Sequence, residues 1–323
     1  MLQFVYATST TATSSALGNY TGQVQQIKQW AVTPGESTTT ATPVAQYTYD
    51  DSGRLREQWD PRISPALKTA YTYDSAGRVA TLTPPGELPW TFTYGKAGSA
   101  ATAGSGMLLS ASRPNLTAGT KSTTDGTTAT TSVVYDVPLS GSTAPNAMGT
   151  SDVAAWGQDD VPTDATAIFP ADSVPASHTG SDLAASDYKR ATITYADASG
   201  REVNTATPGG HLTTTGYDNF GNTVRQLTAV NRELALATSG DGQAEQVALN
   251  IDQMTSADRA ELLSTRGDIH RSGRMGWLNR GSRFAMGWSA HGFRRQWGVK
   301  MTSTVFRVKI FRRHYDWFHG GFL

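Results

Sequence analysis

Two stretches of the chain nearly repeat each other, and this repetition limits the possible folds more than any other feature. The segments 47–55 (YTYDDSGRL) and 71–79 (YTYDSAGRV) carry glycines, Gly53 and Gly77, that lie 24 residues apart. A fixed period of this size is typical of proteins built from repeated supersecondary units. Looser copies follow at 193–201 (ITYADASGR) and 217–224 (YDNFGNTV). Because such arrays form extended surfaces, the sequence indicates a surface or container more strongly than a catalytic cleft.

The residue pattern of each repeat unit predicts a β-hairpin. Tyr47 and Tyr49 flank Thr48, so the two-residue period of a strand places both rings on one face. Asp50 can accept hydrogen bonds from backbone N–H groups two residues on, and Gly53 can adopt a positive φ without a Cβ clash. The return strand begins after this turn, and breakers such as Asp60-Pro61 end the unit because proline cannot donate to a β-ladder.

The same reasoning assigns structural roles, in strands or turns, to equivalent residues of the four copies. In the third copy we expect a departure, with Ala196 at the aspartate position and one residue inserted before Gly200. In the fourth copy Asn222 stands in place of the arginine. The motif residues are Tyr47, Tyr49, Asp50, Gly53, Arg54, Tyr71, Tyr73, Asp74, Gly77, Arg78, Tyr195, Gly200, Arg201, Tyr217, Asp218 and Gly221.

These units resemble the YD repeats of bacterial Rhs and wall-associated proteins, which also occur in animal teneurins and insecticidal toxin complexes. The resemblance rests on the pattern Tyr-x-Tyr-Asp-x-x-Gly-Arg-Leu/Val at 47–55 and 71–79, and it extends over residues 1–266. It implies a long β-sheet wound into a hollow shell that often encloses a C-terminal toxin, and a cell-surface or extracellular location. The expected fold is mainly β, with consecutive antiparallel hairpins in part of an open, shell-like sheet, a short helical segment near 255–266 and an irregular tail.

Composition divides the chain into five segments. We expect N-terminal strands and a spacer at 1–46, repeats at 47–95, a Gly/Ser/Thr/Pro-rich insertion at 96–187, repeats with a short helix at 188–266, and a basic tail at 267–323. Within the insertion, 96–131 reads as a long loop and 132–187 as an ordered cover on the sheet, anchored by Trp156 and Phe169. Thr255 and Asp258 match a helix capping box.

The tail differs from everything before it. Residues 1–266 carry 16 Lys and Arg against 25 Asp and Glu, whereas 267–323 carry 11 against 2. Four of the eight tryptophans also lie in the tail. A change of reading frame or a rearrangement near 265–267 would produce this break, so we expect the tail not to belong to the repeat fold. The alternative is a basic effector that acts on nucleic acid, since its arginines alternate with aromatic residues and His314 and His319 bracket Asp316.

The sequence predicts no catalytic residue, metal site or cofactor. It contains no cysteine, which excludes disulfides and thiolate metal sites. The acidic turns lack the spacing of a calcium loop, and the first residues lack the features of a signal peptide, so we expect a fragment of a larger protein.

Three functions are compatible with these features. The first is a non-catalytic structural part of a bacterial cell-surface or secreted shell, with the remainder of that shell or its enclosed toxin as partner. The second is a polymorphic toxin whose effector is the basic tail. The third is a cell-wall carbohydrate-binding module that uses repeat tyrosines such as Tyr49 and Tyr73, although cross-strand packing explains these rings as well.

Overall fold

The structure is a computed structural model, and it describes residues 1–32, 35, 39–97, 103–269 and 275–278. The chain forms two compact units, Met1–Thr214 and Thr215–Leu323. The five segments expected from composition stay a prediction. Among the described residues, no helix is both long and apolar enough to cross a membrane.

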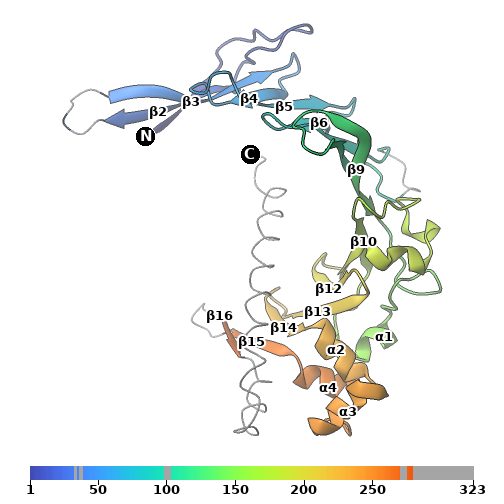
Figure 1. Cartoon of the computed structure of the whole chain (residues 1–323). Coiled ribbons are helices and arrows are strands. Elements are labelled where there is room, and N and C mark those ends of the chain that lie inside the picture. The colour runs from blue at the N-terminus through green and yellow to red at the C-terminus, as the bar shows by residue number, and fades with distance from the viewer. Residues whose placement is uncertain (33–34, 36–38, 98–102, 270–274, 279–323) are drawn as a thin grey trace. The chain divides into compact units, whose positions relative to one another are not determined.

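The first unit is a β-sheet whose strands are hydrogen-bonded in chain order, each antiparallel to the next (Figure 1). The last strand, β13, runs past Thr214 into the second unit. The sheet is open, and β1 lies at an edge. The strands are β1 (Leu2–Tyr6), β2 (Val24–Val32), β3 (Thr39–Tyr49), β4 (Leu55–Trp59), β5 (Lys68–Tyr73), β6 (Val79–Thr83), β7 (Trp90–Tyr94), β8 (Leu108–Leu116), β9 (Thr124–Val134), β10 (Asp164–Phe169), β11 (Thr192–Ala196), β12 (Glu202–Thr207) and β13 (His211–Tyr217).

The predicted hairpins are confirmed. The repeat turns join β3 to β4, β5 to β6 and β11 to β12, and each hairpin has a register shift next to its turn. In the first two hairpins the shift falls between Thr48 and Tyr49 and between Thr72 and Tyr73; in the third it falls between Tyr195 and Ala196. The mainly β fold of consecutive antiparallel hairpins is therefore correct.

The prediction of a long loop at 96–131 is wrong. Strands β8 and β9 occupy about half of that segment and pair with each other over Ser110–Leu116 and Thr124–Ser132. Small residues suggested a loop, but β-branched threonines fit a pleated surface when both neighbours are strands. Strand β10 likewise belongs to the sheet rather than to a cover on it.

The two faces of this sheet differ in chemistry. Residues directly opposite on neighbouring strands share a face. One row across β5 to β9 consists of Thr72, Thr81, Thr91, Ser112 and Thr130. The opposite face of β3 to β7 carries Tyr47, Tyr71, Leu82, Trp90 and Phe92, all half-buried. Neither face is fully covered in this part of the sheet.

The hydrophobic core lies against β9 to β13. Ser132 is opposite both Ser110 and Phe169, so the hydroxyl-bearing face of β5 to β8 continues as the buried face of β10 and the strands after it. The loops around α1 (Thr150–Ala154), η1 (Gly180–Asp182) and η2 (Ala185–Arg190) bury this face. Trp156 is 2% exposed, as expected of an anchor of the cover, whereas Phe169, 1% exposed, belongs to β10 and so to the sheet itself. The principal core residues are Val134, Met148, Val153, Trp156, Ala167, Phe169, Tyr188, Ile193, Tyr195, Ala206 and Leu212.

Three of the four α-helices in the described residues belong to the second unit. Strand β14 (Thr223–Leu227) is followed by α2 (Ala229–Leu236), α3 (Gly240–Ala248), α4 (Ser256–Leu262), β15 (Thr265–Ile269) and β16 (Met275–Leu278). The predicted cap of α4 is confirmed, because the Thr255 hydroxyl accepts a hydrogen bond from the Asp258 N–H at 3.1 Å. The first residues of the tail pair in β15 and β16. The basic and aromatic cluster of the tail, including His314, Asp316 and His319, lies outside the described residues.

Candidate functional site

The repeat turn is built around one aspartate. Asp50 Oδ1 accepts hydrogen bonds from the backbone N–H groups of Ser52 at 3.0 Å and Arg54 at 2.9 Å, and Oδ2 accepts one from Arg54 Nε at 2.9 Å. Gly53 closes the turn with φ +76°, a region that favours glycine. The second copy repeats this arrangement around Asp74, with Arg78 N and Nε at 2.9 and 2.8 Å. Asp50 and Asp74 thus each bind the backbone and the arginine of their own turn.

The third copy keeps the turn but changes the residue before it. Asp197, rather than position 196, accepts bonds from Ser199 N at 2.8 Å, Arg201 N at 2.9 Å and Arg201 Nε at 2.7 Å. Aspartate, glycine and arginine therefore keep the spacing of the first copy, and no residue is inserted. Ala196 occupies the position of Tyr49, while Tyr195 stands where Thr48 does and faces the opposite side. Alignment on Asp-x-x-Gly-Arg would have identified Asp197.

The fourth copy, in the second unit, completes the turn without arginine. Asp218 Oδ1 accepts bonds from Phe220 N at 2.9 Å and Asn222 N at 2.8 Å. The Asn222 amide donates to both carboxylate oxygens, at 3.2 and 3.0 Å. Gly221 has φ +80°. The Asn222 side chain thus takes the place of the arginine side chain that binds the turn aspartate in the other copies. Tyr217, directly before this turn, is half-buried.

These contacts set the charge state of the turn aspartates. The backbone N–H of Arg78, and then its side chain, lower the pKa of Asp74 below its usual 3.8. For Asp50 and Asp197, burial raises the pKa, but the combined hydrogen bonds and charge of Arg54 or Arg201 outweigh it and lower the pKa. All three carboxylates are therefore ionised at neutral pH, as their arginine contacts require.

At four places a tyrosine hydroxyl connects a hairpin to the strand before it. Tyr49 donates to the Val24 carbonyl at 2.6 Å, and Tyr73 donates to the Leu55 carbonyl at 2.7 Å. Two further tyrosines make the same bond, and the sequence analysis missed both. They are Tyr94, which donates to Val79 O at 2.9 Å, and Tyr135, which donates to Leu108 O at 2.8 Å. We call these four bonds the tyrosine ladder.

The motif arginines reinforce the tyrosine ladder. The Arg54 guanidinium carbon lies 5.1 Å from the centroid of the Tyr73 ring, and that of Arg78 lies 4.6 Å from the Tyr94 ring. Each arginine therefore binds the aspartate of its own turn and stacks on the tyrosine of the next hairpin. The other tyrosines of the motif, Tyr47 and Tyr71, lie half-buried on the same face; Tyr71 accepts a weak bond from Gln58 at 3.4 Å.

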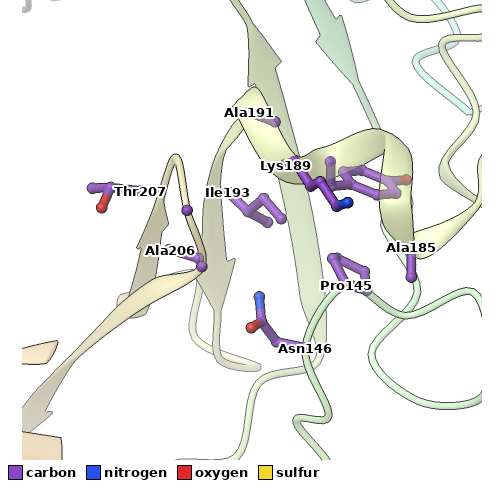
Figure 2. A pocket seen from close by; sticks show the side chains of 11 residues that line it. Pro145, Asn146, Ala185, Lys189, Ala191, Ile193, Ala206 and Thr207 are labelled. Atoms are coloured by element: carbon purple, nitrogen blue, oxygen red, sulfur yellow. The ribbon is translucent and has the colours of Figure 1, made fainter. Parts of the chain in front are cut away.

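A pocket of about 390 Å³ lies over the core of the first unit (Figure 2). The Tyr188 hydroxyl at its wall donates to Gly180 O at 3.0 Å, and Asn146 donates to the Tyr195 hydroxyl at 2.9 Å. Burial raises the pKa of both tyrosines to about 12, so both are neutral. Lys189 is its one charged lining residue, so the pocket offers no acid–base pair. It is lined by Pro145, Asn146, Ala185, Tyr188, Lys189, Ala191, Ile193, Ala206, Thr207, Gly209 and Gly210.

No group of three or more His, Asp or Glu side chains suited to a metal ion occurs within the described part of the chain. The motif residues instead form an internal set of contacts. Their side chains bind the backbone of their own or the neighbouring hairpin, and this arrangement can hold successive hairpins together.

One protein-family model matches part of the chain. Residues 49–87 match the family model of the RHS Repeat. Among curated proteins, none matches this sequence.

Several solved structures show distant likeness to this chain. A Tc holotoxin pore of Photorhabdus luminescens is 14% identical, with a TM-score of 0.26, over 64% of this chain and 11% of that chain. A TcdB2–TccC3 structure is 15% identical, with a TM-score of 0.27, over 65% of this chain and 12% of that chain. A TcdB2–TccC3–Cdc42 structure is 15% identical, with a TM-score of 0.25, over 65% and 11%. This chain therefore matches only about a tenth of the length of those chains.

Proposed function

The chain carries RHS repeats, and from this premise we propose that it is a non-catalytic structural segment of a bacterial cell-surface or secreted protein whose repeat sheet encases or delivers a toxin. Its partners are then the remainder of that sheet and the enclosed polypeptide. The observation that carries the proposal is the tyrosine ladder. The hydroxyls of Tyr49 and Tyr73 are occupied by backbone carbonyls of neighbouring strands, so they link hairpins instead of facing a ligand.

The incomplete burial of both faces of the sheet supports the same function. Strands β3 to β7 carry half-buried side chains on both faces, whereas a domain that folds around its own core buries one face. A segment that continues into a larger sheet does not need such a core, because its neighbours in the array supply further pairing. The Asp–Arg turns then stiffen the rim of each hairpin.

A comparison of binding and stability tests this function. The full chain and the variants Tyr49→Ala and Tyr73→Ala are applied to a glycan array and incubated with DNA and RNA, and their thermal midpoints are measured. We expect no saturable glycan binding and no cleavage in any of the three proteins, with lower midpoints in both variants. Tyr6→Ala is the matched control, since Tyr6 is 56% exposed and the loss of its side chain should leave the midpoint almost unchanged.

Two results would replace the proposal. Saturable glycan binding that disappears in Tyr73→Ala would indicate a carbohydrate-binding module. Cleavage of nucleic acid by the full chain, retained in both tyrosine variants, would indicate an effector elsewhere in the chain.

A further inference from the structure

The pocket over the core of the first unit is separate from the turn contacts and the tyrosine ladder. Its walls come from the loop at Pro145 and Asn146, from η2, from β11 and from the turn between β12 and β13 (Figure 2). Strands β11 and β12 are hydrogen-bonded to each other, and on their outer sides to β10 and β13. The pocket therefore does not depend on an open edge of the sheet.

The floor of the pocket is apolar and consists mostly of small side chains. Ala191, Ile193 and Ala206 are each 2% exposed, and the Tyr188 ring forms part of one wall. An apolar cavity of about 150 Å³ is large enough to hold benzene. The pocket volume of about 390 Å³ therefore has room for one six-membered ring or a short aliphatic chain, together with a polar group attached to it.

Two hydrogen-bond donors face this floor from different walls. Figure 2 shows the Lys189 side chain extending over the pocket from η2, and the Asn146 amide pointing into it from the loop. The Asn146 amide nitrogen donates one N–H to the Tyr195 hydroxyl at 2.9 Å, which leaves its second N–H for a ligand. Within the described ranges, the Lys189 ammonium forms no ion pair or hydrogen bond with another residue.

The charge of the pocket selects an anion. Its lining residues, all in the described part of the chain, include no Asp or Glu. The carboxylate of Asp187 on η2 is already bound to the Ala184 N–H at 2.9 Å. Two donors match the two oxygens of a carboxylate, whereas a phosphate group carries more charge and more acceptor oxygens. The apolar floor requires that the remaining atoms of the anion are apolar.

We propose that this pocket binds a small monocarboxylate whose body is one apolar ring or a short aliphatic chain. The carboxylate oxygens accept hydrogen bonds from the Lys189 ammonium and the Asn146 amide, and the apolar body covers Ile193 and Ala206. A ligand with about nine non-hydrogen atoms binds such a site with a Kd on the order of 1 mM. The site is independent of the structural role of the sheet, because it uses none of the motif side chains that join the hairpins.

Benzoate and its neutral isostere benzamide test this site on the full chain. The δ1-methyl NMR resonance of Ile193, assigned with the variant Ile193→Val, reports binding at the pocket floor. We expect a saturable shift with benzoate, and at least about fivefold weaker binding of benzamide, because benzamide has no charge to pair with Lys189. An Ile193 resonance that does not move in about 20 mM benzoate, well above the expected Kd, would overturn the proposal. Equal affinity for benzamide would overturn it as well.

Substitutions locate the donor and the cavity. Lys189→Gln should weaken benzoate binding at least about fivefold and change benzamide binding by less than about twofold, while Lys189→Arg keeps the charge and most of the affinity. Lys96→Gln makes the same charge change at an exposed residue outside the pocket and should alter benzoate binding by less than about twofold. Ala185→Leu enlarges a side chain of the pocket wall and should weaken both ligands. Equal far-UV circular dichroism of all variants verifies folding. Unchanged benzoate affinity in Lys189→Gln or in Ala185→Leu would place the binding elsewhere and overturn the proposal.

Discussion

At the scale of single residues, the motif works through bonds that cross from one hairpin to the next. The Tyr73 hydroxyl binds the Leu55 carbonyl at 2.7 Å while the Arg54 guanidinium stacks on the Tyr73 ring. Tyr73→Phe removes the bond and keeps the ring, so we expect a loss of about 1 kcal/mol in the free energy of unfolding, measured in urea. Tyr6→Phe should change it by less than about 0.5 kcal/mol, because its ring is exposed. Equal effects of the two variants would show that the hydroxyl bond contributes nothing specific.

The third turn gives a second prediction at this scale. Asp197 is 7% exposed and accepts three hydrogen bonds from Ser199 and Arg201. Asp197→Ala leaves those donors without their acceptor, so we expect a loss of about 2 kcal/mol in unfolding free energy. Asp51→Ala, at an exposed turn position, should cost less than about 0.5 kcal/mol. If Asp197→Ala were as mild as the control, the turn would not depend on its aspartate.

The sequence predicted some of these residues and missed others for physical reasons. Asp50 and Asp74 were identified because their turns keep all the motif residues. Asp197 was missed because Tyr195 was aligned instead of the turn. Tyr94 carries the same ladder bond as Tyr73, but Gly95 follows it where the motif has aspartate, so the local sequence gives no turn signal.

At the scale of elements, a left-handed glycine fixes each hairpin. Gly77 has φ +80°, and no atom lies within 4 Å of a Cβ built there. Any cost of Gly77→Val must therefore come from the backbone, and a β-branched residue at this φ should cost about 2 kcal/mol. Gly77→Asn should cost less, because asparagine tolerates this region. Thermal denaturation of both variants measures the difference, and a valine variant that melts like the parent would refute the strained-turn explanation.

Element prediction succeeded where alternation and turn chemistry coincide. Strands β3 to β7 and the cap of α4 followed from local patterns. Strands β8 and β9 did not, because serine and threonine strands resemble loops until neighbouring strands supply their hydrogen bonds. The buried face of β10 to β13 was also beyond local prediction. Burial there depends on the segment around α1 and η2, which is separated from β12 and β13 in sequence.

At the scale of the whole molecule, stability is unevenly distributed. Most buried apolar side chains in the first unit lie from Val134 onward, whereas β1 to β8 depend on backbone pairing, the tyrosine ladder and the ionic turns. The low hydrophobic and charged content of the sequence, 38% and 17%, fits extended β-structure without a thick core. Because ionic turns replace a core in this part of the sheet, the first unit should be sensitive to acid.

The direction of the pKa shifts gives the sign of this sensitivity. The pKa values of Asp50, Asp74 and Asp197 are lowered from 3.8 in the folded chain. A carboxylate with a lowered folded pKa stabilises the fold above its unfolded pKa, and this stabilisation is lost as the pH falls through the folded pKa. We therefore expect the urea midpoint to be steady from about pH 7 to 5 and to fall steeply below about pH 4. The triple variant Asp50→Asn, Asp74→Asn, Asp197→Asn should start lower and fall less. An equally steep fall in the triple variant would mean that other carboxylates control acid unfolding.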